Sequence, residues 1–296
     1  MIRIDDFQKS QLEQLQHLMN SHIDSLIPGW VLPAEYIASR LRANPSERAD
    51  TWVAERSTIV ALDGDQIQAA VHLLRYQEDA PVEIKASFEW ILAWPNEPAA
   101  ANSLIAAAHD RLDRWQVRLE GIGIDLPIPV CVGIPDVWPH MSELFEKGGY
   151  APDRDSYEAV YGGSLDHIPP PGHPPIEGLE IKRTMGKFGT RFTALLDGKE
   201  VSRCECYADL TQGGRLPALA NWSELSEIET ADEWRNKGIG AWVVKHAIHW
   251  LRLAGCDRCV FSVGPEDEEA GAARFYSRFG WEPFVRERKW WTRREL

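Results

Sequence analysis

The stretch ELSEIETADEWRNKGIGAWVVKHAIHWLRLAG, residues 224–255, decides the fold of this chain. Its first part, ELSEIET at residues 224–230, predicts a strand that runs into RNKGIG at residues 235–240. Apolar residues then recur at the spacing of one helix face, and Gly255 is a typical C-terminal stop. The stretch therefore predicts a strand, a glycine-containing turn and an amphipathic helix.

The chemistry of this turn favours an anion. Gly238 and Gly240 let the backbone approach a ligand, and the first N–H groups of the helix have no partner within it. The helix dipole attracts phosphate to that end, and Arg235 and Lys237 add positive charge. The turn is not a P-loop, because GxxxxGK[ST] is absent, and it lacks the third glycine of a dinucleotide fingerprint.

The flanking sequence predicts further strands and helices. In the second half they are strands at 179–184 and 259–264, a hairpin at 192–210 that turns at Asp197-Gly198, and a short helix at 270–280. In the first half they are strands at 1–7, 51–56, 57–76 with a turn at Asp63-Gly64, 82–94 and 126–134, and helices at 9–27, 97–115 and 141–146.

The two halves look like copies of one unit. LFEKGGYAP at residues 144–152 aligns with FYSRFGWEP at residues 275–283, which indicates an internal duplication. The proline-rich run IPPPGHPPI at residues 168–176 can form neither a helix nor a strand interior. We therefore expect domains at 1–165 and 176–296, joined by a linker at 166–175. The second half has no helical stretch after its first strand, whereas the first half has one.

With these motifs, the second half resembles the GNAT superfamily of N-acetyltransferases over roughly residues 177–291. RNKGIG matches the family's [RQ]xxGx[GA] turn after the fourth strand, and the later helix carries Tyr276 with Gly280 four residues on. The resemblance implies an α/β fold with a mixed, mostly antiparallel central sheet and flanking helices, in two tandem GNAT-like domains. The first domain resembles a degenerate copy, because residues 94–104 lack glycine and Phe145 stands at the tyrosine position.

The resemblance further implies that acetyl-CoA is the co-substrate and lies in a V-shaped opening beside the fourth strand, with no metal. The pyrophosphate would bind the turn, and pantetheine would pair with the main chain of that strand, where one N–H would polarise the thioester carbonyl. Glu269 stands where the family often has an asparagine that holds pantetheine. The implied cofactor residues are Ile228, Glu229, Thr230, Arg235, Asn236, Lys237, Gly238, Ile239, Gly240, Ala241 and Glu269.

The catalysis implied by this family is direct attack of a neutral primary amine, from a small molecule or peptide, on the thioester. Tyr276 matches the acid that protonates the departing thiolate. Glu224 and Glu227 are the candidate bases, and Glu224 is preferred because it matches a base position used in some family members. The alternative is a sensor or scaffold that binds acyl-CoA without catalysis. O-acyl transfer, or transfer of a longer acyl chain, is a variant of the hypothesis of N-acetyl transfer.

The amino-acid composition restricts the classes of binding partner that we expect. The chain has 296 residues, 44% of them hydrophobic and 26% charged, as in packed soluble proteins. The formal net charge of −13 disfavours nucleic acid and favours cationic amines. No apolar run approaches the roughly 18 residues of a membrane span, and MIRIDDFQKS is unlike a signal peptide. We therefore expect a cytoplasmic monomer or homodimer without nucleic-acid or membrane partners.

The cysteines raise the alternative of a zinc site. Cys204 and Cys206 form a CxC, and Cys256 and Cys259 form a CxxC. The first pair lies in a strand-like run, where buried thiols are common. The odd total of five cysteines also argues against a disulfide framework, so we expect reduced cysteines in the core.

Overall fold

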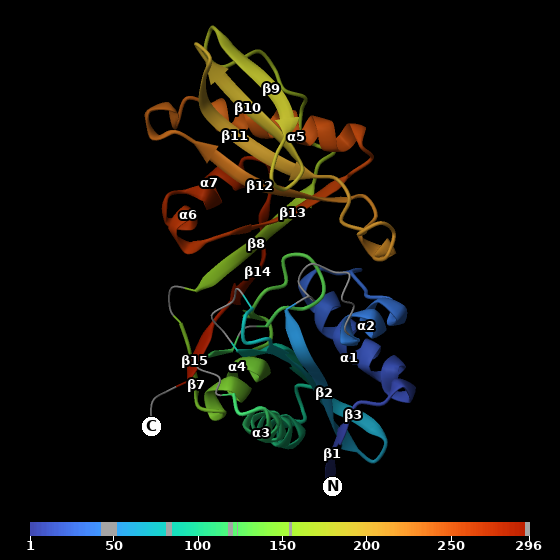
Figure 1. Cartoon of the computed structure of the whole chain (residues 1–296). Coiled ribbons are helices and arrows are strands. Elements are labelled where there is room, and N and C mark those ends of the chain that lie inside the picture. The colour runs from blue at the N-terminus through green and yellow to red at the C-terminus, as the bar shows by residue number, and fades with distance from the viewer. Residues whose placement is uncertain (43–51, 81–84, 118–120, 123, 154–155, 294–296) are drawn as a thin grey trace. The chain divides into compact units, whose positions relative to one another are not determined.

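The chain divides into two compact units, each of which is described by itself. The computed structural model describes residues 1–42, 52–80, 85–117, 121–122, 124–153 and 156–293. Unit 1 comprises Met1–Glu158 and Val285–Leu296, and unit 2 comprises Ala159–Phe284 (Figure 1). No helix in the described part of the chain is long and apolar enough to span a membrane.

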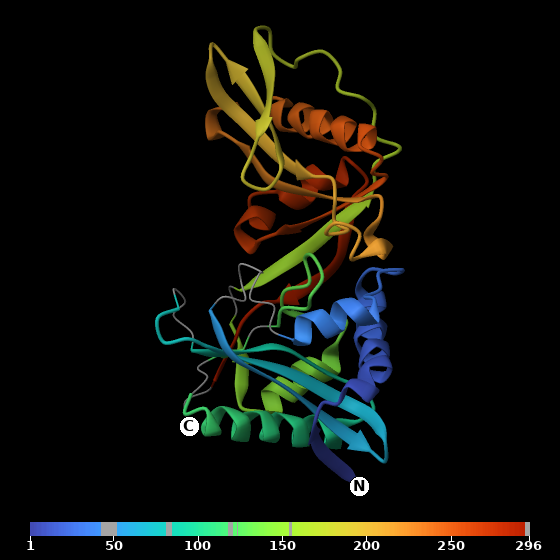
Figure 2. The ribbon, with the colours of Figure 1, turned by 45° about the vertical axis from the view of Figure 1, so that its right-hand side comes forward.

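Unit 1 is built on a four-stranded antiparallel sheet in the order β1-β2-β3-β4. Helices α1 and α3 cover its two faces (Figure 2). Because both faces are covered, the middle strand β3 is apolar along most of its length, and residues 69–74 are buried. The bounds are β1 Ile2–Asp6, η1 Lys9–Gln11, α1 Leu12–Leu26, α2 Ala34–Leu41, β2 Val53–Asp63, β3 Gln66–Tyr76, β4 Ala86–Ala93 and α3 Pro98–Arg114.

The rest of unit 1 combines the end of the first half with the C-terminal segment. Its elements are β5 Gly121–Ile122, β6 Ile134–Pro135, α4 Pro139–Lys147, β7 Tyr150–Pro152 and β15 Trp291–Arg293. β15 pairs with both β5 and β7, and the last residues of β14 pair with β6. The C-terminal residues therefore complete the first unit.

The strand expected at residues 126–134 is wrong. Only β6 and an isolated bridge between Asp125 and Val132 form there. Pro127 and Pro129 remove two backbone donors, and Val130 has a φ of 58°, which extended backbone does not allow. The expectation also missed α2, which is a short helix of eight residues.

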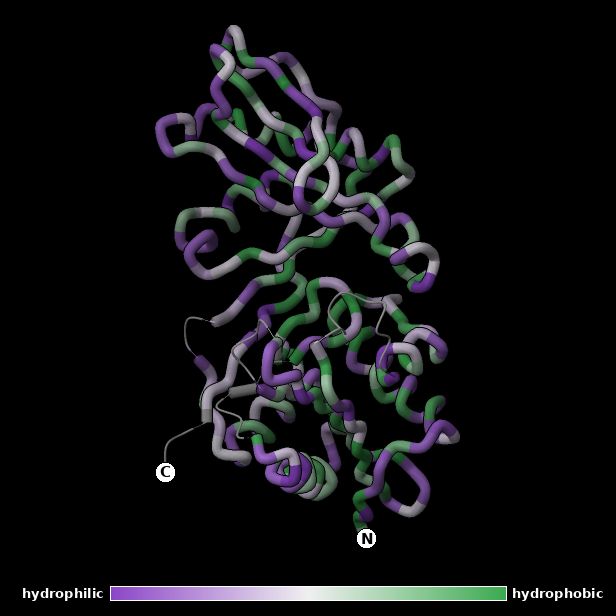
Figure 3. The backbone as a smooth tube through the Cα atoms, in the orientation of Figure 1, coloured by the Kyte–Doolittle hydropathy of each residue, from purple (hydrophilic) through white to green (hydrophobic). Residues whose placement is uncertain are grey.

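Unit 2 has a sheet in the order β8-β13-β12-β11-β10-β9 with α5 packed on it. All neighbours are antiparallel except β12 and β13, which are parallel. Hydrophobic and hydrophilic residues are mixed along these strands (Figure 3). The bounds are β8 Tyr157–Ser164, β9 Leu179–Met185, β10 Thr190–Leu196, β11 Lys199–Tyr207, η2 Pro217–Leu219, β12 Trp222–Thr230, η3 Asp232–Trp234, α5 Ile239–Leu253, β13 Arg258–Val263, α6 Pro265–Glu269, α7 Ala272–Ser277 and β14 Glu282–Arg288.

The units have different limits from the domains expected at 1–165 and 176–296. β8 pairs along its length with β13, from Arg258↔Ser164 to Val263↔Ala159, so unit 2 begins before the prolines. The expected linker at 166–175 packs on α5, where the indole of Trp242 donates a 3.0 Å hydrogen bond to Gly172 O. The prolines mark a break in secondary structure, whereas strand pairing determines which unit each segment joins.

The helix-to-strand repeat noticed in the sequence has a structural counterpart. α4 is followed by Gly149 and β7, and α7 is followed by Gly280 and β14. Both glycines have left-handed φ values, 85° and 72°, and the next aromatic residue, Tyr150 or Trp281, is fully buried. The same local design therefore closes both helices.

The expected asymmetry between the halves is also present. α1 and α2 lie between β1 and β2, whereas β9 and β10 are joined by residues 186–189 alone. The buried carboxylate of Glu205 anchors that turn by accepting the N–H of Phe188 at 2.7 Å and the Nε–H of Arg191 at 2.6 Å. A Cβ at Gly186 would lie 2.4 Å from the Glu205 carboxyl carbon, so this position has no room for a side chain.

The core of unit 2 lies between α5 and the sheet and includes Cys204, Cys206, Cys256 and Cys259. Cys131 is buried in unit 1, so all five cysteines are core residues, as expected. Among the residues that the structure describes, no group of three or more His, Cys, Asp or Glu side chains is placed to hold a metal ion.

Candidate active site

A V-shaped opening lies between β12 and β13. The two strands pair only from Trp222↔Arg258 to Glu224↔Val260, although β12 continues to Thr230 and β13 to Val263. The register between β11 and β12 shifts at Arg203/Glu205, opposite Glu227, whose φ is 47°. A bulge of this kind bends its strand, which takes β12 away from β13. A cavity of about 600 Å³ occupies the opening.

The cavity brings together most of the residues singled out from the sequence. Those in its lining are Glu227, Ile228, Glu229, Thr230, Arg235, Asn236, Gly238, Ile239, Gly240, Ala241 and Tyr276. Three others are not among the lining residues, namely Glu224, Lys237 and Glu269. The Lys237 ammonium instead lies 4.3 Å from the centre of the Trp234 ring.

Sequence reasoning missed part of the lining. The side chains that it overlooked include Trp234, Ser262, Asp267, Phe275 and Arg278. Trp234 directly precedes the glycine-containing turn, and Arg278 follows Tyr276 by two residues. Their closeness in sequence to these two motifs could have identified both as lining residues. Asp267 could have been found only by placing α6 beside the opening.

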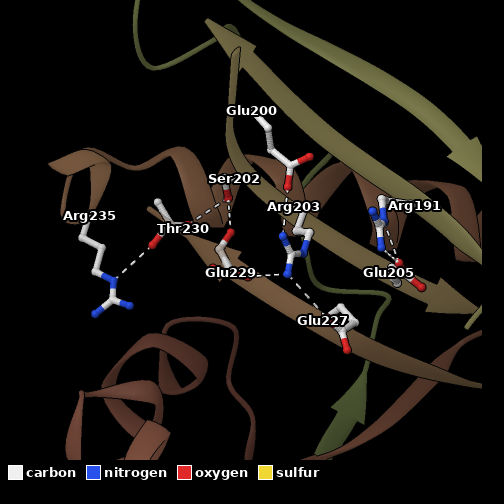
Figure 4. A network of polar contacts seen from close by, with 9 residues as sticks. All are labelled: Arg191, Glu200, Ser202, Arg203, Glu205, Glu227, Glu229, Thr230 and Arg235. Atoms are coloured by element: carbon white, nitrogen blue, oxygen red, sulfur yellow. Dashed lines mark hydrogen bonds and ion pairs between the residues drawn. The ribbon is translucent and has the colours of Figure 1, made fainter. Parts of the chain in front are cut away.

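The turn has the backbone geometry expected of an anion site. Gly238, the N-cap of α5, has a φ of 83°, which strongly favours glycine, and no side chain caps the helix. The N–H groups of the first turn of α5 are therefore not used by a capping side chain. Arg235 is held at the turn, with Nε donating to Thr230 O at 3.1 Å (Figure 4) and Nη2 lying 3.1 Å from Asp232.

Gly240 is required for close packing at the cavity. A Cβ on Gly240 would lie 2.9 Å from Thr230 Oγ1. We expect Gly240→Val to raise the Kd for acetyl-CoA at least about tenfold, because the new side chain displaces β12 or the turn. Isothermal titration calorimetry measures this effect. Ala254→Val, which adds the same side chain to the exposed C-cap of α5, is the control and should bind normally.

Tyr276 places a phenol in the cavity wall. Its side chain is 7% exposed and packs against Phe261, with ring centres 4.5 Å apart. Burial raises the pKa of Tyr276, and the nearby Cys204 and Asp267 add to the effect. Its hydroxyl has no hydrogen-bond partner among the described residues. The phenol is therefore protonated near neutral pH and available to donate.

The two candidate bases differ in their surroundings. Glu227 lines the cavity, but its carboxylate lies 3.7 Å from Nη2 of Arg203, and the side chain is 38% exposed (Figure 4). Glu224 lies next to the lining residue Leu225 at the last paired position of β12, and it is half-buried. Burial raises the pKa of Glu224, which suits a group that takes up a proton.

The described residues of unit 1 do not reproduce the features of this site. α3 follows β4 with Glu97 as its N-cap and Pro98 at its first position, so there is no glycine turn. Phe145 is fully buried against Trp291, with ring centres 5.6 Å apart. A cavity of about 410 Å³ in this unit lies elsewhere, beside β1, β2 and the ends of α1, α2 and α3.

A parallel strand pair that opens beside a glycine-containing helix start is the architecture of the GNAT acetyltransferase fold. Residues 167–281 match the model of the Acetyltransferase (GNAT) family.

Solved structures extend the likeness to the whole chain. A tandem GNAT protein from the clavulanic acid biosynthesis pathway aligns with a TM-score of 0.64 at 13% identity, covering 99% of this chain and 98% of that one. A GCN5-related N-acetyltransferase from Sphaerobacter thermophilus gives 0.63 at 14% identity, with coverages of 98% and 94%. The chain therefore has the mixed α/β fold of tandem GNAT proteins.

A third similar structure is longer than this chain. It is the GCN5-related glucosamine N-acetyltransferase region of a fungal multi-domain GH3 β-N-acetylglucosaminidase, with a TM-score of 0.61 at 16% identity. The alignment covers 98% of this chain but only 38% of that one. A search of curated proteins found no match.

Proposed function

We propose that the protein is an N-acetyltransferase that moves the acetyl group of acetyl-CoA to a primary amine of a small molecule or peptide. The match to the GNAT family model supports acetyl transfer from an acyl-CoA. The observation that carries the proposal is a single cavity that joins the uncapped start of α5 to the phenol of Tyr276. A phosphate group at one end and a thioester at the other match these two features of one molecule.

In this proposal, the pyrophosphate accepts hydrogen bonds from the N–H groups of residues 236–241, with Arg235 supplying positive charge. The pantetheine arm then lies along β12, where Ile228, Glu229 and Thr230 line the opening. The acetyl group reaches the narrow end of the V, where strand pairing begins at Glu224. A main-chain N–H of β12 that points at the carbonyl oxygen stabilises the charge that develops there.

The proposed acetyl transfer requires two proton transfers. The amine nitrogen attacks the carbonyl carbon, and the C–S bond breaks as the amide forms. Tyr276 donates its phenolic proton to the departing thiolate. Glu224 accepts the proton lost by the amine, directly or through one water molecule, and solvent restores both groups.

The two glutamates provide a matched test of the base. We expect Glu224→Gln to lower kcat/KM by about 100-fold, because proton acceptance by a positioned base contributes that much or more. Wild-type activity should rise with pH through the raised pKa of Glu224, and this acidic limb should vanish in the variant. Steady-state rates across pH measure both effects.

Glu227→Gln is the control. Its carboxylate is already paired with Arg203 and partly exposed, so we expect a change of less than about threefold. The assignment of Glu224 would be wrong if Glu227→Gln removed the acidic limb and Glu224→Gln left it in place.

The second candidate is a non-catalytic acyl-CoA sensor or scaffold. Glu269 favours it, because this acidic residue stands where the family often has the asparagine that holds pantetheine. Calorimetric titration with acetyl-CoA, followed by acetyl transfer to a panel of cationic and neutral amines, separates the candidates. Binding without transfer to any amine would favour the sensor.

A further inference from the structure

A partly exposed cation, Arg203, pairs with two of the acidic residues that line the cavity. Arg203 lies on β11, opposite the bulge of β12, and its guanidinium contacts three carboxylates (Figure 4). Nη2 lies 2.5 Å from Glu229 Oε2 and 3.7 Å from Glu227 Oε2, and Nη1 donates to Glu200 Oε1 at 3.1 Å. Two of these carboxylates, on Glu227 and Glu229, belong to lining residues, whereas Arg203 itself is not in the lining.

The charges of the lining explain why this contact matters. The lining contains three acidic side chains, Glu227, Glu229 and Asp267, and two cationic ones, Arg235 and Arg278. Arg235 also lies 3.1 Å from Asp232, which offsets part of its charge. The lining alone therefore carries a net negative charge, which repels phosphate groups. The positive charge of Arg203 beside Glu227 and Glu229, which Glu200 shares, offsets part of this negative charge.

The backbone keeps this arrangement in place. Ser202 Oγ donates to Glu229 O at 2.8 Å and lies 2.8 Å from Thr230 Oγ1 (Figure 4). These contacts hold the end of β12 against β11 beside the residues that Arg203 pairs with. The cation and its two carboxylates are therefore fixed at the edge of the cavity.

We propose that Arg203 determines donor specificity by offsetting the charge of Glu227 and Glu229, so that the cavity accepts a thioester carrying phosphate groups. This inference rests on the proposed function, because acetyl-CoA is the donor that it concerns. Arg203 acts through the two carboxylates and does not touch the donor. Its effect is therefore confined to charged donors, whereas a purely structural role would affect every donor.

The test compares two donors. S-acetylpantetheine has the same thioester as acetyl-CoA but lacks its pyrophosphate and its phosphorylated adenosine. We expect Arg203→Met to raise the Kd for acetyl-CoA about tenfold at low salt and to leave that for S-acetylpantetheine within about twofold. The loss for acetyl-CoA should shrink as salt is added, because salt screens the repulsion. Titration calorimetry on the full chain provides all of these values.

Two further variants separate charge from packing. Arg203→Lys keeps the charge and should bind acetyl-CoA with nearly the wild-type Kd. Arg203→Met combined with Glu229→Gln removes one cation and one anion, and it should restore the Kd to within about threefold of the wild type. An equal loss of both donors in Arg203→Met, or no restoration in the double variant, would overturn the role of Arg203. If the wild type bound no acetyl-CoA, the proposed function would itself be wrong.

Discussion

Tyr276→Phe is expected to bind acetyl-CoA with a Kd within about threefold of the wild type and to lose at least about 100-fold in kcat. The substitution removes only the hydroxyl, which has no hydrogen-bond partner among the described residues, so the ring keeps its packing against Phe261. The departing thiolate then has no proton donor from the protein. Release of free CoA thiol during turnover measures kcat, and calorimetry measures Kd.

Tyr161→Phe is the matched control for this prediction. Tyr161 lies in the same aromatic cluster, 5.6 Å from Tyr276 between ring centres, and its hydroxyl donates to Glu268 at 2.7 Å. We expect its kcat to stay within about threefold of the wild type. If Tyr276→Phe kept more than half of the wild-type kcat, Tyr276 would not be the acid.

Glu287→Gln should remove most of the loss of stability that unit 1 undergoes as the pH rises from about 4.5 to about 8. Glu287, on β14, is 1% exposed, and its Oε2 accepts the N–H of Val132 at 3.0 Å. Its other oxygen is buried without a hydrogen-bond partner among the described residues. Burial, with smaller contributions from Glu158 and Asp136, raises the pKa of Glu287 to about 8, although the Val132 bond and Lys289 oppose the shift.

The direction in which the free energy of unfolding changes with pH follows from proton binding. The folded pKa of about 8 lies above the ordinary 4.5, so the folded state holds a proton that the unfolded chain has released. The free energy of unfolding therefore falls as the pH rises from 4.5 to 8, by about 5 kcal/mol at 1.36 kcal/mol per pKa unit. Glutamine keeps an acceptor for Val132 and cannot ionise, so the variant should be the more stable protein at pH 9.

Urea unfolding at acidic, neutral and alkaline pH, monitored by hydrogen exchange at Val132, tests this prediction. Glu282→Gln, an exposed glutamate on the same strand, is the control and should follow the wild type at every pH. Equal pH dependence in Glu287→Gln and the wild type would contradict the account.

Local sequence was enough to predict the turn and the helix that follows it. Gly238 and Gly240 occupy positions where backbone angle and packing demand glycine, and α5 ends just before Gly255, whose φ is 92°. The hairpin turns at Asp63-Gly64 and Asp197-Gly198 were equally local. Such features are determined by residues close together in the chain.

Other features depend on pairing between distant residues. The bulge at Glu227 arises from the register of β12 against β11, and Arg203 reaches the cavity wall only through that register. The partner of β8 is a strand about a hundred residues further along the chain. Periodicity within a segment cannot reveal such partners, which is why the compact units differ from the division that the Pro-rich run predicts.

The exchange of strands between the two halves of the sequence has a consequence for fragments of this protein. A fragment ending at residue 165 would lack β15, which pairs with both β5 and β7, and a fragment starting at residue 176 would leave one side of β13 without β8. Each half of the sequence supplies a strand that pairs with strands of the other half. We therefore expect that neither half folds correctly when it is expressed by itself.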